Sequence, residues 1–291
     1  MSNQEIQMSE YLSPLLQFGK IGVIHSVFEH SFNVEINQQL INIACFHEYL
    51  SSFGINLPED RFNTLASALQ TGNRVKINDD QLTIYSTSSV RQVTLKPCRL
   101  VPLNVFKLGL SKKQLLLLKP FLAEKNWQTK IGLPVDKRAS TLFARMAQPN
   151  REWTTTEWQE VVGYLLGRGK GLTPSGDDLL MGYQLVLGTV SDPRGIALAV
   201  ALGEAQTATT AISQAYLTCA TKGYANSLVH QLFSDLAQNQ EEKIEEQLEK
   251  IMRIGHSSGM DLAFGIWLAL QAIEGEESEG ETWKRVNKNK Q

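Results

Sequence analysis

The sequence predicts an α+β chain, with a β-rich N-terminal domain followed by a predominantly α-helical C-terminal domain. Short runs that alternate apolar and polar residues fill the segment from about Lys20 to Leu100, whereas apolar residues recur every three or four positions after Leu103. The first pattern is typical of half-buried strands and the second of amphipathic helices. We therefore place a β-rich domain at 1–105 and a helical domain at 106–276.

The strands of the first domain are separated by polar turns. The candidate strands lie in the runs GVIHSVFEHSFNVEI, LINIA, NRVKI and QLTIYS. Between them stand Asn-Gln-Gln, Thr-Gly-Asn and Asn-Asp-Asp, which are residues that favour tight turns. The segment is therefore predicted to be β-rich.

The second domain opens with the helical patterns KKQLLLLKPFLAEKN, STLFARMAQ and TEWQEVVGYLLGRG. Pro120 lies inside the first of these, so this helix is expected to end or kink there. Further helices are predicted at 178–190, 195–221, 224–237, 241–253 and 259–274. The tail, 277–291, is charged and nearly devoid of apolar residues, so we expect it to be disordered.

Composition argues against several classes of partner. A net charge of -2, with 42% hydrophobic and 20% charged residues, is ordinary for a soluble protein and predicts neither nucleic-acid nor membrane binding. The N-terminus lacks the features of a secretory signal, and no apolar stretch reaches the roughly 20 residues of a membrane span. We expect a cytoplasmic protein. Its cysteines and histidines show no ligand spacing, so neither a metal nor a cofactor is predicted.

A glycine-rich loop is the strongest local signal, in the run GRGKGLTPSGDDLLMG. Gly167, Gly169 and Gly171 permit positive φ and free successive N–H groups to face an anion. Thr173 and Ser175 are predicted caps of the next helix, whose positive end would face the loop. The run is neither a Walker A loop nor a dinucleotide fingerprint, so ATP and NAD are not expected.

The start of this helix recurs at an offset of 83 residues. PSGDDLLMGYQLVL aligns without gaps with SSGMDLAFGIWLAL, which pairs Ser175, Gly176 and Asp178 with Ser258, Gly259 and Asp261. Gly182 and Gly265 also match, and they would let the two helices pack closely around a two-lobed polar pocket. Asp177 aligns with Met260 and therefore has no aspartate counterpart in the second copy. The repeated aspartates, Asp178 and Asp261, are thus the stronger functional candidates.

A structural interpretation is also open. Ser-Gly-x-Asp is a good helix start in its own right, and a carboxylate in the first turn offsets the helix dipole by about 0.3–1 kcal/mol. The adjacent Asp177 and Asp178 can instead bind Mg²⁺, hold a substrate amide or accept a proton. Two gap-free copies favour function over capping alone.

Two further groups complete the candidate site. His256 stands at the junction before the second helix start, where an imidazole can exchange a proton. Thr209, Ser213 and Tyr216 share one helical stripe, whose hydroxyls either line a pocket or bond back to carbonyl groups.

We predict catalytic roles for Asp178, Asp261 and His256. The predicted substrate- or anion-binding residues are Gly169, Lys170, Gly171, Thr173, Ser175, Gly176, Asp177, Thr209, Ser213, Ser257, Ser258 and Gly259.

The three motifs together resemble the AllH family, a subunit of bacterial oxamate carbamoyltransferase. GxGxGLTPSGDD, TTAISxxYL and GHSSGxD stand in the family's order and cover roughly 150–275. The resemblance implies reversible conversion of oxalurate and phosphate to oxamate and carbamoyl phosphate in anaerobic allantoin and purine degradation. It also implies partner subunits, one of them FdrA-like and similar to acyl-CoA synthetases. These small anions suit a glycine-rich helix start, although the loop alone does not select this reaction.

The resemblance suggests a mechanism in outline. Loop amides with Lys170 or Arg168 would hold phosphate, Ser175 and Ser258 would bind oxamate, and an aspartate or His256 would manage the proton. Two alternatives stay open: a non-catalytic subunit that binds a small anion and regulates its partners, and a metal-dependent hydrolase built on the three aspartates of the helix starts.

Overall fold

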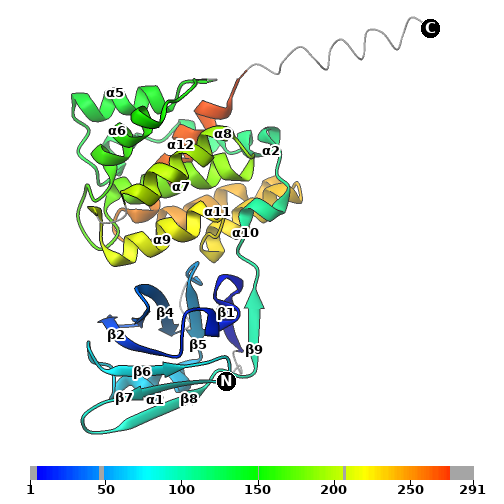
Figure 1. Ribbon diagram of the computed structural model, residues 1–291. Coiled ribbons are helices and arrows are strands. Elements are labelled where there is room, and N and C mark those ends of the chain that lie inside the picture. The colour runs from blue at the N-terminus through cyan, green and yellow to red at the C-terminus, as the bar shows by residue number, and fades with distance from the viewer. Residues whose placement is uncertain (1–4, 46–48, 150, 206–207, 276–291) are drawn as a thin grey trace, which may run out of the picture.

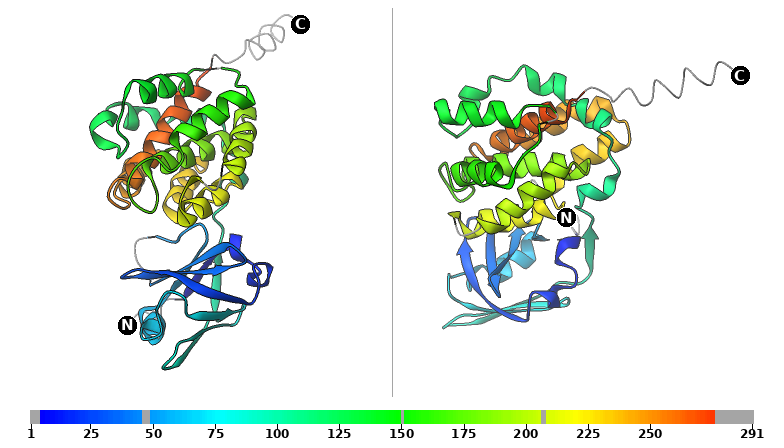
Figure 2. Two further views of the ribbon diagram at one scale, coloured as in Figure 1. Left: turned by 60° about the vertical axis from the view of Figure 1, so that its left-hand side comes forward. Right: turned by 45° about the horizontal axis from the view of Figure 1, so that its top comes forward.

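The computed structural model describes residues 5–45, 49–149, 151–205 and 208–275. A curled sheet over residues 6–101 is followed by helices over 112–273, which confirms the predicted α+β class. In the views of Figures 1 and 2 the β-rich part lies on one side of the helical part. The predicted disorder of 277–291 falls outside the described residues.

Nine strands of the described chain form one sheet in the order β8-β7-β6-β2-β3-β4-β5-β1-β9. They are β1 (Ile6–Ser9), β2 (Ile21–Val27), β3 (Ser31–Ile36), β4 (Gln39–Cys45), β5 (Gly54–Leu57), β6 (Arg74–Ile77), β7 (Gln81–Tyr85), β8 (Val90–Thr94) and β9 (Cys98–Val101). Neighbours are antiparallel except for the parallel pairs β4–β5 and β1–β9. Asn37 and Gln38, with φ of 49° and 64°, form the predicted turn between β3 and β4, as a two-residue hairpin of this kind requires.

The predicted helices appear in the predicted order, but one of them is divided in two, and the helices at 59–66 and 127–130 were not predicted. They are α1 (Glu59–Ala66), α2 (Lys112–Leu116), α3 (Lys119–Ala123), α4 (Trp127–Lys130), α5 (Lys137–Met146), α6 (Thr155–Leu165), α7 (Ser175–Thr189), α8 (Pro193–Glu204), α9 (Ala211–Thr221), α10 (Ser227–Ala237), α11 (Ile244–Met252) and α12 (Ser258–Ile273). Pro120 stands at the start of α3 and separates it from α2, as expected. The single helix predicted at 195–221 is wrong: α8 ends at Glu204, and the Thr210 hydroxyl caps a new helix, α9, by accepting the Ser213 N–H.

Two hydrophobic cores lie on either side of α9. One core fills the sheet and includes Ile212 and Cys219 from α9, while the other joins the helices from Val105 to Ile273. α9 therefore lies between the sheet and the remaining helices, where Figure 1 shows it. In the described part of the chain, no helix has the length and apolar composition needed to cross a bilayer.

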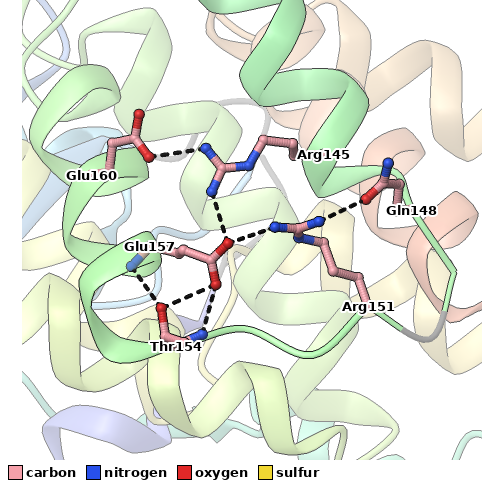
Figure 3. Close-up of polar contacts among 6 residues, drawn as sticks. All are labelled: Arg145, Gln148, Arg151, Thr154, Glu157 and Glu160. Atoms are coloured by element: carbon pink, nitrogen blue, oxygen red, sulfur yellow. Dashed lines mark hydrogen bonds and ion pairs between the residues drawn. The ribbon is translucent and has the colours of Figure 1, made fainter.

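An ion-pair network fastens α5 to α6 (Figure 3). Glu157 Oε1 accepts from Arg145 at 3.0 Å and from Arg151 at 2.5 Å, and Oε2 accepts the Thr154 N–H at 2.9 Å. The Thr154 N–H and then the Arg151 guanidinium lower the pKa of Glu157 to about 2. Arg145 also pairs with Glu160 at 2.9 Å, so the helix that leads into the glycine-rich loop is held at its start.

Candidate functional site

α7 and α12 pack against each other through matched glycines. A Cβ on Gly182 would lie 2.2 Å from the Leu262 carbonyl oxygen, and a Cβ on Gly265 would lie 2.0 Å from the Leu179 carbonyl oxygen. No other residue fits at these distances, so each glycine lets the backbone of the partner helix approach. The predicted close packing of the two repeated helices is confirmed.

Each repeated helix also begins against the end of the helix before it. A Cβ on Gly176 would lie 1.9 Å from the carbonyl oxygen of Leu165 at the end of α6. A Cβ on Gly259 would lie 2.0 Å from the carbonyl oxygen of Ile251 in α11. The glycine of each Ser-Gly-x-Asp unit is therefore required for close packing against the preceding helix. The repeat extends to two helix–loop–helix units, α6–α7 and α11–α12.

At the two helix starts, the first serine of each helix contacts the aspartate of the other helix. The hydroxyls of Ser258 and Thr173 hydrogen-bond the Asp178 carboxyl, while the hydroxyl of Ser175 hydrogen-bonds the Asp261 carboxyl. Thr173 Oγ1 and Ser258 Oγ are themselves 2.9 Å apart. Each aspartate thus accepts a hydrogen bond from the serine of the other copy, and the two helix starts form one polar cluster.

The Asp178 half of this cluster faces a cavity of about 190 Å³. Its lining includes Thr173, Asp178 and Ser258 from the two helix starts, together with Tyr49, Tyr216 and Asn226. Two hydrogen bonds of 2.9 Å join Leu50 to Ser227, the chain neighbours of Tyr49 and Asn226, and hold these two lining residues near each other. The cavity therefore takes residues from both the β-rich part and the helical part.

The Asp261 half is closed by the chain itself. The Gly132 N–H donates to Asp261 Oδ1 at 2.8 Å. A Cβ on Gly132 would lie 2.4 Å from Ser257 Oγ and 2.5 Å from Ser175 Oγ, so the loop before α5 sits directly on both hydroxyls. The predicted two-lobed pocket is thus corrected: one lobe is a cavity and the other is filled by the segment around Gly132.

Both repeated carboxyls are buried, and both have raised pKa values. Asp178 is 4% exposed and Asp261 is 1% exposed. Burial raises the pKa of Asp178 well above its usual range, the Asp261 charge raises it further, and the Ser258 and Thr173 hydroxyls oppose the rise. Burial also raises the pKa of Asp261, against hydrogen bonds from Ser175, Gly132 and Ser257. Asp178 therefore holds a proton more readily than a solvent-exposed aspartate.

One oxygen on each carboxyl stays without a protein partner. Oδ2 of Asp178 and Oδ2 of Asp261 are buried and make no hydrogen bond to any described residue. A buried polar atom of this kind is destabilising unless something else satisfies it. At Asp178 the adjoining cavity offers the space for such a group.

Asp177 has a different environment from its neighbour. Its Oδ1 accepts the Gly167 N–H at 2.6 Å, and its Oδ2 accepts from the Ser213 hydroxyl at 2.5 Å and from the Thr209 hydroxyl. The carboxylate therefore joins the end of α6, the start of α7 and the start of α9. Thr209 and Ser213 are occupied by this carboxylate, and Tyr216, on the same stripe, is the member that reaches the cavity.

The glycine-rich loop lies outside the cavity wall. Gly169, Lys170 and Gly171 are exposed, and Gly169 and Gly171 have φ of 129° and 91°. The amides of these three residues donate to no described residue. Arg168 pairs with Asp136 at 3.0 Å and stacks over a tyrosine ring, so it is not directed at the loop.

Other predicted residues are placed differently from expectation. Ser175 and Ser258 are the first residues of α7 and α12, and neither helix has a side-chain cap, so the capping predicted for Thr173 and Ser175 is wrong. Their hydroxyls bond carboxyls instead, because each helix start faces the aspartate of the other copy. His256 is exposed on the loop before α12 and is not among the residues that line the cavity.

Gly132, Tyr49 and Asn226 were not identified from the sequence. Gly132 stands in a Gly-Leu-Pro run that indicates only a connection, and Asn226 carries the ordinary signature of a helix cap, since its Oδ1 accepts from Leu228 and Val229. Tyr49 has no local signal. In the described ranges, no three His, Cys, Asp or Glu side chains gather as a metal site would require.

Comparison with known families gives two matches. Residues 165–270 match the family model described as oxamate carbamoyltransferase subunit AllH, and residues 4–99 match the AllH family N-terminal domain. No solved structure matches the chain significantly. The first match runs from the end of α6 to near the end of α12, and the second spans nearly the whole sheet. The chain therefore belongs to the AllH family, whose description is that of a subunit of oxamate carbamoyltransferase.

Proposed function

We propose that this chain supplies a substrate site of an oxamate carbamoyltransferase complex, interconverting oxalurate plus phosphate with oxamate plus carbamoyl phosphate. The observation that carries the proposal is Asp178, a buried carboxyl with an unpartnered oxygen at a cavity between two helix starts. The family description supports a role as one subunit among several. FdrA-like and other subunits would supply the remainder of the active complex.

The site favours small anions for electrostatic reasons. The positive ends of α7 and α12 point toward one cluster, and a helix start attracts negative charge by about 0.3–1 kcal/mol at an exposed surface and more when partly buried. The Thr173 and Ser258 hydroxyls add neutral donors at the cavity wall. The free amides of the glycine-rich loop, with Lys170 beside them, form a second place where phosphate can bind.

The reaction requires one proton to change place. The bond between the carbamoyl carbon and the oxamate nitrogen breaks, and a bond from that carbon to a phosphate oxygen forms. The phosphate loses a proton and the leaving nitrogen gains one. A carboxyl with a raised pKa suits both halves of this exchange, so Asp178 donates to the nitrogen and recovers the proton from phosphate.

Asp261 is proposed as a positioning residue. Its Oδ1 holds Gly132, and Gly132 closes on the hydroxyls of Ser175 and Ser257. Loss of this carboxyl would loosen the loop on which the second helix start rests. We therefore expect a smaller loss of activity from Asp261→Asn than from Asp178→Asn.

The test is formation of carbamoyl phosphate from oxalurate and phosphate, with the chain and its FdrA-like and other partners purified and mixed. Asp178→Asn should lower turnover roughly 10²–10⁴-fold, the range of a lost general acid–base group. Asp235→Asn is the matched control, because Asp235 is equally buried, lies on α10 and does not line the cavity. Full turnover without this chain, or with Asp178→Asn, would contradict a catalytic role and favour a regulatory anion-binding subunit.

A further inference from the structure

The half of the site around Asp261, which is closed by Gly132, can be compared with the open half around Asp178, which borders the cavity. Asp178 and Asp261 occupy equivalent positions of the repeat, and each is contacted by the serine that starts the opposite helix. At Asp261 the partner is a peptide N–H, that of Gly132, 2.8 Å from Oδ1. An amide group of the chain itself therefore fills the place that corresponds to the cavity beside Asp178.

The apolar residues that follow the two aspartates also have different surroundings. Phe264 lies three residues after Asp261, and its ring packs against Trp127 and Phe143 at centroid distances of 5.4 and 5.1 Å. Met181 holds the equivalent position after Asp178, and it lines the cavity. Trp127 and Phe143 thus pack on the residue three positions after Asp261, whereas the equivalent residue after Asp178 borders a cavity.

The remaining walls of the open half suit a neutral polar group. Burial raises the pKa of the Tyr216 phenol, and the neighbouring Tyr49 and Asp178 raise it further, so Tyr216 presents a neutral hydroxyl. Among the described residues, neither Lys nor Arg lines this cavity, which carries the Asn226 amide side chain beside the tyrosines. A group that brings a second full charge to the Asp178 carboxyl would lack a counter-ion there.

We propose that the open half-site is a subsite for an uncharged amide-type group, a primary carboxamide or the end of a urea, held at Asp178 as the Gly132 peptide is held at Asp261. This inference rests on the proposed function and deepens it, since it assigns the end of the substrate that Asp178 contacts. The carboxylate end of the ligand then lies away from Asp178, toward the N-terminal ends of α7 and α12, where the helix dipoles favour negative charge.

Amide and carboxyl groups match in hydrogen-bonding capacity. A protonated carboxyl donates its O–H to the amide oxygen and accepts an amide N–H with its other oxygen. A ligand bound in this way satisfies Asp178 Oδ2, the atom that no described residue satisfies. The pair is neutral as a whole, so it avoids burying an uncompensated charge.

The experiment is calorimetric titration of the full-length chain, alone and in its complex, with oxamate and with oxalate. These probes have nearly the same size, and they differ in that oxalate has a second carboxylate where oxamate has a carboxamide. We expect oxamate to bind at least tenfold more tightly than oxalate. Asp178→Leu should weaken oxamate binding at least tenfold, whereas Asp178→Asn should keep it within about threefold, because an asparagine amide also pairs with an amide.

Two further variants serve as a control and as an independent test of oxamate binding at the cavity. Asp235→Leu removes a carboxyl that is equally buried but lies away from the cavity, and it should leave oxamate binding unchanged. Met181→Phe copies the residue of the closed half, fills part of the cavity, and should weaken oxamate binding tenfold even if Asp178→Leu does not fold. Equal affinity for oxamate and oxalate, or unchanged oxamate binding in both Asp178→Leu and Met181→Phe, would overturn the inference.

The same variants separate this inference from the proposed reaction. If Asp178→Asn binds oxamate but does not turn over, both proposals are supported. If Asp178→Asn turns over normally while Asp178→Leu loses oxamate binding, the proton role is wrong and the subsite stands. If Asp178→Leu and Met181→Phe bind oxamate normally while Asp178→Asn loses turnover, the subsite is wrong and the proton role stands.

Discussion

The two Ser-Gly-x-Asp segments share their sequence and their contacts with each other, yet their surroundings give them different roles. Asp178 and Asp261 are both almost fully buried, and both lie opposite a serine of the other copy. Asp261 is covered by Gly132, whereas Asp178 borders a cavity of about 190 Å³. The difference comes from residues far away in the chain and not from the motifs themselves.

This contrast shows how a repeated unit can keep one copy for structure and the other for binding. The glycines that bring α7 and α12 together are needed equally in both copies. The residues that pack on the two helix starts differ between the copies. The Gly132 loop covers Asp261, whereas Tyr49, Tyr216 and Asn226 line the cavity beside Asp178. A duplicated scaffold thus becomes asymmetric through what packs on it.

The largest expected effect tests the shared part of the scaffold. Gly182→Ala and Gly265→Ala should each lower the free energy of unfolding by about 2–3 kcal/mol, because the new Cβ would overlap a backbone carbonyl of the partner helix. Chemical denaturation measures this. Gly163→Ala is the matched control: no atom lies within 4 Å of its Cβ position in α6, so alanine there should stabilise by about 0.5–1 kcal/mol. A large decrease in the free energy of unfolding at only one of the two glycines would show that the two copies do not contribute equally to the packing of α7 against α12.

A smaller effect is expected from a change in the Gly132 loop, which covers Asp261 and has no counterpart among the described residues at Asp178. Gly132→Ala should destabilise by about 1–2 kcal/mol, because its Cβ would overlap the hydroxyls of Ser175 and Ser257, whose side chains can move slightly. The loop should retreat from Asp261, and amide hydrogen exchange at Gly132 should quicken. Unchanged stability together with unchanged exchange would show that this loop does not hold the closed half.

Much of this arrangement could be predicted from the sequence because its causes are local. The alternating runs predicted β2, β3, β4, β6 and β7, and Pro120 predicted the break between α2 and α3. The repeat at an offset of 83 residues predicted that Gly182 and Gly265 pack, because a glycine inside a helix lowers its stability unless it allows another backbone to approach. Periodicity and repetition are properties of the sequence itself, so they can be recognised without a structure.

What could not be predicted depends on contacts across the chain. The exchange of serines between the two aspartates needs the helices to be placed first, so the local signature of a cap was misleading for Ser175 and Ser258. Gly132 enters the site through the fold alone, 129 residues before Asp261. The repeat includes a counterpart of Asp178 but not of Asp177, and of these two it is Asp178 that lines the cavity.

The smallest expected effect compares the two buried carboxyls through pH. The folded-state pKa of Asp178 is raised, so the stability that its proton contributes is fully present below the ordinary aspartate pKa and falls as the pH rises toward the raised pKa. Above the raised pKa that stability is lost, and the folded protein carries a buried charge. Asp178→Asn removes the charge and should raise the Tm at pH 8 by roughly 2–3 °C, about the shift that ~1 kcal/mol gives in a protein of this size. The gain should shrink as the pH falls through the raised pKa, and vanish below the ordinary aspartate pKa.

Asp261→Asn should give a smaller gain at pH 8, because the Gly132 N–H and the Ser175 and Ser257 hydroxyls stabilise the charged form of Asp261. Calorimetric unfolding of the wild type and both variants between pH 8 and pH 5.5 makes the comparison. If Asp178→Asn gained nothing at pH 8, or if its gain grew as the pH fell, the Asp178 carboxyl would not carry the buried charge that sets the open half apart from the closed one.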